Sequence, residues 1–489
     1  MYPNSKLLID GEMCEAEGEA TYPDISPWDG KEIGRAADGS VSDLDRAIAA
    51  ARRAFDESDW PTDHAKRIAA LRRYAAVLQA NRPRFANLAR DEAGAPGASI
   101  FSAACDAPLG MIDGWLDVAE NYDWEQDIGT SEMFGITSRR KVWKEAIGVV
   151  AAITPWNVPT QINIAKVLPA LAAGCTVVLK PAPETPMLGS LLGELAVEAG
   201  LPAGVLNVIT SADAATVGAA LVADERVDAI SFTGSTATGK AIMAAASERV
   251  AKVFLELGGK SASIILDDVE DFAQAVGSGA MVCFHAGQGC ATITRMLVPR
   301  ERHDEAAAIL KHALEGVAYQ DPNSPMQIMG SLISRRQQER VLEYIEIGKA
   351  EGATLVTGGG IPEDKPEGFF VEPTLFANVT NDMRIAQEEI FGPVLVLIPY
   401  DDDDDAVRIA NDSVYGLSGA VHSSNMERAL DIARRIRTGT FGINGGMWYA
   451  GDAPFGGYKQ SGIGRESGIE GFEEYLETKC VAFPESAAA

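Results

Sequence analysis

Short runs of consecutive apolar residues, separated by glycine and proline, dominate the chain between residues 147 and 233. The runs fall at 148–153, 175–179, 205–209 and 229–232, and alanine-rich stretches lie between them. An unbroken apolar run is typical of a strand that is buried on both faces, and the stretches between such strands are typical of crossover helices. The pattern therefore predicts a parallel α/β sheet of the nucleotide-binding type.

A helical period precedes this region, and a second set of alternating elements follows Cys290. Apolar residues recur at helical spacing across 41–93, which predicts two amphipathic helices. The second set is expected as strands at 295–298 and 394–398 and helices at 303–317, 335–351 and 405–413. The acidic run 401–405 fronts the last of these helices, where negative charge favours a helix amino terminus. A solvated loop explains that run equally well.

Two further apolar segments, 122–146 and 476–483, lie outside both sets of alternating elements. Both are peripheral in the sequence. We expect them to form extended arms that pair with another subunit.

Composition narrows the range of partners. A chain of 489 residues is long enough for roughly two to four domains, and 46% hydrophobic residues are typical of a folded α/β enzyme. Asp and Glu total 70 against 42 Lys and Arg, so the formal net charge is −28. Such a charge repels phosphate backbones and anionic lipid surfaces, so neither nucleic acid nor a membrane is an expected partner.

The amino terminus lacks the basic start and apolar core of a secretory signal, and no apolar run of about eighteen residues is long enough to cross a bilayer. Six cysteines occur without CxxC spacing, and five histidines occur without metal-ligand spacing. These features favour a cytoplasmic protein with reduced thiols and no metal site.

Cys290 and Glu256 are the strongest candidates for covalent chemistry. Cys290 ends the run Gly-Gln-Gly-Cys, and Glu256 begins the run Glu-Leu-Gly-Gly-Lys. A thiolate can attack a carbonyl carbon, and a carboxylate can activate the water that later releases the product. Taken singly, a cysteine is more often a small buried hydrophobe, and a carboxylate in an apolar strand can be structural. His285 invites a cysteine–histidine pair, but residues five apart face each other poorly on a helix, so we expect a structural role for it.

Polar or glycine-rich positions follow three of the predicted strands. Asn157, Lys180 and the pair Gly234 and Ser235 each come after an apolar run. Ligands of open α/β sheets bind at the carboxyl ends of the strands, so these residues are candidates to donate to an oxygen, a ribose or a pyrophosphate. The alternatives are a helix cap for Asn157 and a solvated surface lysine for Lys180.

Two nucleotide-binding signatures are incomplete. The frame from Gly234 to Lys240 is similar to a P-loop, but Ala241 stands where magnesium requires Ser or Thr. The GxGxxG dinucleotide fingerprint is absent, which by itself argues against a dehydrogenase.

Six segments together resemble the NAD(P)-dependent aldehyde dehydrogenase family over nearly the whole chain, in the family's order and spacing. They are Thr-Pro-Trp-Asn (154–157), Phe-Thr-Gly-Ser-Thr (232–236), Glu-Leu-Gly-Gly-Lys (256–260), Gly-Gln-Gly-Cys (287–290), Glu-Ile-Phe (389–391) and Pro-Phe-Gly-Gly (454–457). The family binds its dinucleotide in a variant Rossmann domain without the standard glycine fingerprint, which answers the objection above.

The resemblance implies an α/β fold in three parts. These are a variant Rossmann dinucleotide-binding domain (1–123 and 147–257), an α/β catalytic domain (258–474) and a small β oligomerisation arm (124–146 and 475–489). A homodimer or homotetramer follows from the same resemblance.

Each matching residue takes an implied role. Cys290 is the nucleophile that forms a thiohemiacetal and then a thioester, and Asn157 with the Cys290 backbone N–H is the oxyanion hole. Glu256 is the general base for hydrolysis, and Lys166 is the lysine of a proton relay from that base. The positions that match cofactor contacts are Ile153, Trp156, Lys180, Pro183, Phe232, Gly234, Ser235, Glu389 and Phe391.

Departures from the family pattern bear on cofactor and substrate. Pro183 stands where many NAD-preferring relatives carry a ribose-binding glutamate, with Glu184 one position late, so we expect NAD and leave NADP open. Val158 and Ala165 stand where several relatives have bulky aromatic residues, and His285 replaces a common asparagine without an assigned function.

Tyr449 and Phe455 supply aromatic side chains on another wall of the expected substrate tunnel. A wide apolar tunnel suits an aromatic, terpenoid or long aliphatic aldehyde. Two alternatives stay open. An acylating dehydrogenase, which hands the acyl group to coenzyme A, typically lacks the glutamate at Glu256, and a catalytically idle scaffold protein would more plausibly have lost Cys290, Asn157 or Glu256.

Overall fold

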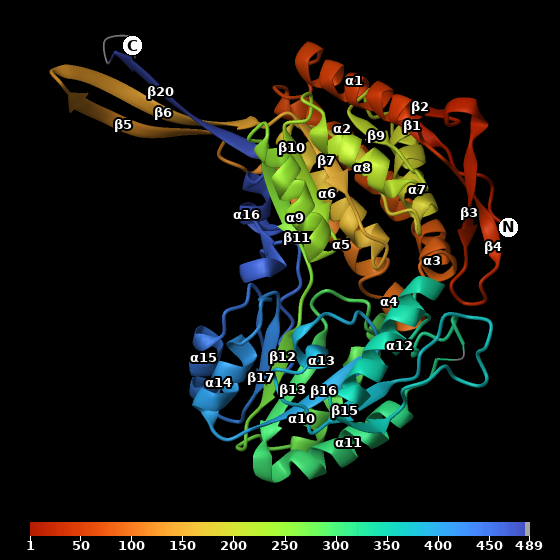
Figure 1. Cartoon of the computed structure of the whole chain (residues 1–489). Helices are drawn as coiled ribbons and strands as arrows, with labels where there is room; N and C mark the ends of the chain where they lie inside the picture. Colours follow the sequence, from red (N-terminus) through yellow and green to blue (C-terminus); the bar gives the residue numbers. More distant parts are fainter. Residues whose placement is uncertain (320, 485–489) are drawn as a thin grey trace.

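The computed structural model describes residues 1–319 and 321–484 of the chain, and the α/β fold class expected from the sequence is confirmed. Two α/β lobes lie one above the other in Figure 1, and a β arm projects from the upper lobe. The first and second sheets form the cores of these lobes.

The apolar runs between residues 148 and 232 form neighbouring parallel strands of the first sheet. Its order is β19-β11-β10-β7-β8-β9-β1-β2. The five parallel strands β11, β10, β7, β8 and β9 follow the Rossmann order, and the order reverses between β7 and β10. The strands are β1 (Leu7–Ile9), β2 (Glu12–Cys14), β7 (Val149–Ile153), β8 (Thr176–Lys180), β9 (Leu206–Val208), β10 (Ala229–Thr233), β11 (Lys252–Glu256) and β19 (Gly462–Ile463).

Helices cover both faces of the first sheet. One core joins α2, α3, α5, α6 and α7 to the sheet, and a second joins α1, α8 and α9 to it. The helices of this lobe are α1 (Val41–Glu57), α2 (His64–Ala80), α3 (Arg82–Asp91), α4 (Gly97–Ile100), α5 (Asp106–Glu120), α6 (Pro159–Ala173), α7 (Pro186–Glu198), α8 (Ala214–Ala223) and α9 (Thr236–Ser247). A separate hairpin consists of β3 (Thr21–Ile25) and β4 (Glu32–Ala37), preceded by the short helix η1 (Glu17–Glu19).

The prediction of two helices across 41–93 was wrong, because the structure has three. The helical period continues past Asn81, but α2 ends before that residue and α3 begins at Arg82 with a proline in its first turn. Proline lacks the N–H that a helix interior needs and is tolerated in a first turn, so the chain starts a new helix there.

The second lobe is built on a seven-stranded sheet with the order β14-β15-β16-β13-β12-β17-β18. All its neighbours are parallel except the edge strand β14. The elements are β12 (Ser261–Ile265), β13 (Ile293–Pro299), β14 (Thr354–Thr357), β15 (Thr374–Ala377), β16 (Val394–Tyr400), β17 (Gly419–His422), β18 (Gly442–Ile443), α10 (Phe272–Gly277), η2 (Ser278–Gly287), η3 (Arg300–Arg302), α11 (His303–Glu315), α12 (Arg335–Ala350), α13 (Arg384–Gln387), α14 (Asp403–Asn411), α15 (Met426–Arg435) and η4 (Lys459–Ser461). The chain then returns to the first lobe, where α16 (Gly468–Glu473) packs on α5 and α6.

The acidic run 401–405 is a helix amino terminus, as one of its two interpretations predicted. Helix α14 begins at Asp403, and the side chain of Asp402 accepts a hydrogen bond from the Asp405 backbone N–H at 2.9 Å. Such a cap satisfies one of the free N–H groups of the first turn.

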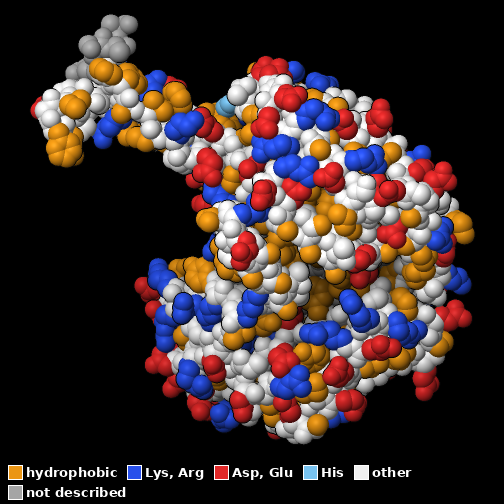
Figure 2. Space-filling model, turned by 45° about the horizontal axis from the view of Figure 1, so that its top comes forward, with side chains coloured by type: hydrophobic (Ala, Val, Ile, Leu, Met, Phe, Trp, Pro, Cys, Tyr) orange, Lys and Arg blue, Asp and Glu red, His pale blue; other side chains and the backbone are white. Residues whose placement is uncertain are grey.

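The two peripheral apolar segments pair with each other. Strands β5 (Glu125–Met133), β6 (Ile136–Ala146) and β20 (Leu476–Pro484) form an antiparallel three-stranded sheet that stands away from the lobes (Figure 1). Hydrophobic side chains gather on this arm in Figure 2. Phe134, between β5 and β6, is 95% exposed. The last part of the predicted arm, 485–489, lies outside the described residues.

Candidate active site

The carboxyl edge of the first sheet brings four of the sequence candidates together. The strand register pairs Ile153 with both Lys180 and Phe232, and it pairs Thr233 with Glu256. Because these strands are parallel, their last residues share one edge of the sheet, next to the reversal between β7 and β10. This is the edge at which open α/β sheets bind ligands.

The second sheet presents its amino edge to the same region. Cys290 lies just before β13, and Glu389 lies just before β16. The two lobes are joined at this point, because the Asn157 side-chain Nδ2 donates to the backbone oxygen of Gln288 at 2.8 Å. The space-filling view shows a hollow between the lobes (Figure 2).

A left-handed turn positions Cys290. His285, Ala286 and Gly287 have φ values of 49°, 53° and 73°, and the Gln288 N–H closes the turn by donating to the His285 oxygen at 3.1 Å. The expectation that a helix separates His285 from Cys290 was therefore wrong. The His285 ring is buried, and burial lowers its pKa to about 4 against the opposing effect of the Asn157 backbone, so the ring is neutral.

Asn157 does not cap the following helix. The N-cap position of α6 is Val158, with no side-chain cap, while the Asn157 amide is buried and bonded to the Gln288 oxygen. The capping alternative is therefore wrong. An amide carries two N–H donors, so one stays available beside the loop that carries Cys290.

Negative charge surrounds the Cys290 thiol. Burial is the largest cause that raises its pKa, to about 12, and the carboxylates of Glu256, Glu389 and Glu466 raise it further. Position 259 requires glycine, because a Cβ there would lie 2.4 Å from the Cys290 backbone oxygen. This accounts for one glycine of the run Glu-Leu-Gly-Gly-Lys. Cys290 therefore stays a thiol until a neighbouring base takes its proton.

Glu256 has the environment of a base. It is 4% exposed, and burial followed by the charge of Glu466 raises its pKa well above the ordinary value, while Lys166 and Arg465 oppose that shift. Its Oε2 has no hydrogen-bond partner in the part of the chain that the structure describes. A Cβ at Gly456 would lie 2.6 Å from its Oε1, so glycine is needed beside this carboxylate. A carboxylate with a raised pKa is a stronger base than an exposed one.

Lys166 lies in the same buried region. Its ammonium donates to Glu466 Oε1 at 2.5 Å and to Ser231 Oγ at 3.0 Å, and its side chain is 1% exposed. No role was expected for Glu466 from the sequence, although a carboxylate that follows the glycine-rich segment 456–464 was a usable signal. Ser231 lies inside an apolar strand, and nothing in the sequence marked it.

The predicted cofactor residues fit a dinucleotide. Lys180 is 3% exposed at the end of β8, and burial lowers its pKa to about 8, while the charges of Glu184 and Asp213 raise it. A buried cation of this kind can bind a ribose or phosphate oxygen. Gly234 and Ser235 precede α9, and Ser235 Oγ accepts the Thr238 N–H at 3.2 Å, so a helix amino terminus faces this edge.

The remaining cofactor candidates line the same side of the site. Glu389 Oε1 accepts the Gly259 N–H at 2.9 Å, and burial raises the pKa of Glu389 to about 6. The rings of Trp156 and Phe391 meet edge to face at 5.4 Å. A carboxylate next to an aromatic pair suits a ribose and a nicotinamide ring. Ile153 and Pro183 are half-buried, and Phe232 is buried in β10.

The predicted substrate residues come from two parts of the chain. Val158 is the N-cap residue of α6, and Ala165 lies in the middle of that helix. Phe455 stacks on Trp448 at 5.5 Å and Tyr449 meets Trp448 edge to face at 6.0 Å, and these three rings form an aromatic wall. Burial raises the pKa of Tyr449, and so do the charges of Glu466 and Cys290. The aromatic wall therefore lies near Cys290, and Trp448 is a member of it that the sequence had not indicated.

The described residues, 1–319 and 321–484, contain no helix long and apolar enough to cross a membrane. They also contain no group of three or more His, Cys, Asp or Glu side chains arranged to hold a metal ion.

Known proteins resemble this chain over almost its full length. The sequence model described as the aldehyde dehydrogenase family matches residues 14–481. A 3-succinoylsemialdehyde-pyridine dehydrogenase of Pseudomonas sp is 42% identical over 97% of this chain and 98% of its own length. A betaine aldehyde dehydrogenase of Bacillus subtilis (strain 168) is 41% identical over 97% of this chain and 96% of its own.

A solved structure resembles the whole fold. The crystal structure of a Mycobacterium tuberculosis aldehyde dehydrogenase complexed with NAD+ has a TM-score of 0.94 and 41% identity, and the match covers 99% of this chain and 98% of that one. The glycine-rich segments, the two facing sheet edges and these matches lead to one conclusion: the chain belongs to the aldehyde dehydrogenase family.

Proposed function

We propose that this protein oxidises an apolar aldehyde to the carboxylic acid with NAD, through a covalent intermediate on Cys290. The observation that carries the proposal is the meeting of a thiol, a carboxylate of raised pKa and a free amide N–H where the two sheet edges face each other. These are a nucleophile, a base and an oxyanion donor.

The first step joins the aldehyde to the enzyme. Glu256 accepts the thiol proton of Cys290, and the sulfur forms a bond to the carbonyl carbon. The carbonyl oxygen becomes an oxyanion, which the Asn157 amide and the Cys290 backbone N–H stabilise. A dinucleotide held by Lys180 and Glu389 would supply a hydride acceptor, and loss of hydride from this carbon would leave a thioester on Cys290.

The second step releases the acid. Glu256 first releases the thiol proton to solvent. It then takes a proton from a water molecule, the oxygen attacks the thioester carbon, and the carbon–sulfur bond breaks; the proton passes from Glu256 to the leaving sulfur and restores the Cys290 thiol. A base with a raised pKa favours this water attack over transfer to coenzyme A. The resemblance points the same way, because acylating relatives typically lack this glutamate.

Two acidic side chains near Lys180 favour NAD over NADP. The charges of Glu184 and Asp213 act on Lys180, and they would repel the 2′-phosphate of NADP. Glu184 thus places a carboxylate one residue after Pro183, the position at which many NAD-preferring relatives carry a glutamate.

The arm supports a homodimer or homotetramer. It exposes Ile128, Met133, Phe134 and Ile136, and a contiguous apolar surface on a projecting sheet is typical of a subunit contact. A second copy of the chain is the expected partner.

The substrate class is tested by initial rates of the purified chain with nonanal, benzaldehyde, citral, glyceraldehyde and betaine aldehyde, each with NAD and with NADP. The aromatic wall of Trp448, Tyr449 and Phe455 predicts a higher kcat/KM for the first three aldehydes, with a gain of roughly fourfold per buried CH2 group. We expect faster turnover with NAD. A preference for glyceraldehyde or betaine aldehyde would contradict the apolar assignment, and a preference for NADP would contradict the role of Glu184 and Asp213.

A further inference from the structure

Lys166 is held from two sides by oxygens of different kinds. Glu466 supplies a carboxylate oxygen at 2.5 Å, and Ser231 supplies a hydroxyl oxygen at 3.0 Å. Tyr475 donates its own hydroxyl to the same Ser231 Oγ at 3.3 Å. The four side chains come from α6, β10 and two segments near the carboxyl terminus, and they form one buried chain of hydrogen bonds next to Glu256.

Tyr475 is fixed in place by contacts of its own. Its backbone oxygen accepts the Ile147 N–H at 3.1 Å, and its ring meets the Phe254 ring at 5.6 Å. The residue is 4% exposed and directly precedes β20, the arm strand. A buried phenol held in this way can keep the Ser231 hydroxyl in one orientation.

We propose that Ser231 and Tyr475 are positioning residues that hold the Lys166 ammonium against Glu466, beside the general base Glu256. The inference rests on the proposed function, since it concerns the hydrolysis step of that reaction. Neither residue touches the substrate or the nucleophile. Both act through Lys166.

The consequence falls on the charge of Glu256. Glu466 and Glu474 raise the pKa of this carboxylate, and Lys166 and Arg465 lower it. A buried ammonium needs its hydrogen-bond acceptors, so loss of the Ser231 oxygen leaves Lys166 free to move away from Glu256. The pKa of Glu256 then rises further, and the base is protonated, and so inactive, up to a higher pH. Acylation of Cys290 by an activated ester depends less on that base, because the leaving group departs as a stable anion and needs no proton.

The test follows deacylation directly and needs no cofactor. The full-length protein is mixed with p-nitrophenyl acetate, and intact-mass spectrometry follows the acetyl adduct as it forms and disappears between pH 5.5 and 9. The variants are Ser231→Ala, Tyr475→Phe and Ser231→Thr, which keeps the hydroxyl in a strand that tolerates β-branching. Tyr74→Phe is the matched control, because it removes another buried phenol of the same lobe, one that donates to the Leu192 oxygen at 2.8 Å.

We expect the midpoint pH, at which the deacylation rate is half its maximum, to rise by up to about one unit in Ser231→Ala and by less in Tyr475→Phe. At low pH this shift lowers the deacylation rate by up to about tenfold. Ser231→Thr and Tyr74→Phe should keep the wild-type profile, and circular dichroism should be the same for all. An unchanged profile in Ser231→Ala, or an equal shift in Tyr74→Phe, overturns the inference. The proposed function fails separately, if the wild-type adduct still forms in Cys290→Ala or if Glu256→Gln deacylates at the wild-type rate.

Discussion

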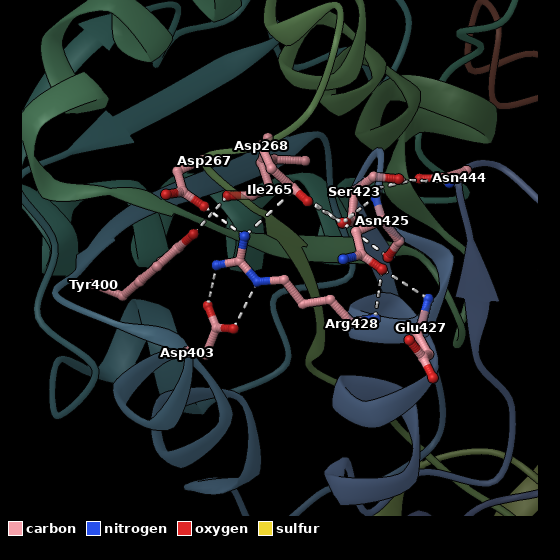
Figure 3. Close-up of polar contacts among 10 residues, drawn as sticks. All are labelled: Ile265, Asp267, Asp268, Tyr400, Asp403, Ser423, Asn425, Glu427, Arg428 and Asn444. Carbon is pink, nitrogen blue, oxygen red and sulfur yellow. Dashed lines mark hydrogen bonds and ion pairs between the residues drawn. The ribbon is translucent and has the colours of Figure 1, made fainter.

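The two edges of the second sheet carry different kinds of polar side chain. Its amino edge faces the first lobe and carries Cys290 and Glu389. Its carboxyl edge, at the far side of the lobe, carries the ion-pair network of Arg428 (Figure 3). By the general rule for open sheets the carboxyl edge is the binding edge, and the first sheet obeys it. The second sheet contributes its amino edge to the site, so the active site is the place where opposite edges of two sheets meet.

The carboxylates of the Arg428 network are paired with a guanidinium, whereas Glu256 and Glu389 of the site form no ion pair among the described residues. Arg428 donates to both oxygens of Asp403, at 2.8 and 2.6 Å, and to Asp267 at 2.7 Å, and Ser423 donates to Asp268 at 2.8 Å (Figure 3). The hydrogen bond that Asp267 accepts from Arg428 lowers the pKa of this carboxyl group. At the active site burial raises the pKa of Glu256 and Glu389 instead. Pairing favours the charged form of a carboxyl group and burial disfavours it, so only the buried carboxylates are poised to exchange protons.

The largest effect that would test this contrast is loss of the nucleophile. Cys290→Ala should abolish aldehyde-dependent reduction of NAD, because no other described group offers a thiol at this site. The rate of NADH formation measures it. The matched control is Cys480→Ser, which changes an exposed cysteine of the arm and should keep full activity. Retained turnover in Cys290→Ala would exclude the assigned nucleophile.

A smaller but still large effect is expected from loss of Asn157, the proposed oxyanion donor. Asn157→Ala should lower kcat by about 10²–10³, or about 2.7–4 kcal/mol of transition-state stabilisation. Steady-state rates with one good aldehyde measure this, and thermal unfolding checks that the loop around Gln288, which the amide also contacts, keeps its fold. A loss of only a few-fold would mean that the amide serves the loop alone.

The smallest effect is expected at the remote edge. Arg428→Ala should lower the free energy of unfolding by about 1–2 kcal/mol, because the network is partly exposed and each such pair contributes little, and kcat should not change. The melting temperature measures the loss, and Arg408→Ala, which removes a more exposed pair with Asp405, is the control.

The pH dependence of that stability has a definite sign. The folded-state pKa of Asp267 is lowered, so its contribution is present above the unfolded pKa and is lost as the pH falls through the folded one. The wild type and Arg428→Ala should therefore differ at neutral pH and converge in acid. A kcat that falls along with the melting temperature would contradict the separation of the two edges.

Much of the fold could be predicted from sequence, for a specific reason. The runs at 148–153 and 175–179 are apolar on both faces, and only a sheet covered by helices on both sides buries such strands. The helical period failed to predict the boundary between α2 and α3 at Asn81. The period of apolar residues continues across this boundary, which Pro83 imposes in the first turn of α3. For the site, Cys290, Glu256 and Asn157 could be proposed because their glycine-rich settings match a family. Ser231 and Tyr475 could not, since an isolated hydroxyl in an apolar run has no local signature.

The sequence by itself determined the buried parallel strands of the first sheet, several of the helices, the family, and the candidate nucleophile, base and amide, because local periodicity and short glycine-rich motifs can be recognised along the chain. Only the tertiary structure decided which oxygen Asn157 contacts, that Glu466 and Ser231 hold Lys166, and that Arg428 pairs far from the site. Those contacts join residues as far as 300 positions apart. They depend on how two sheets are oriented and how deeply each charge is buried, and neither quantity has a pattern that can be recognised along the chain.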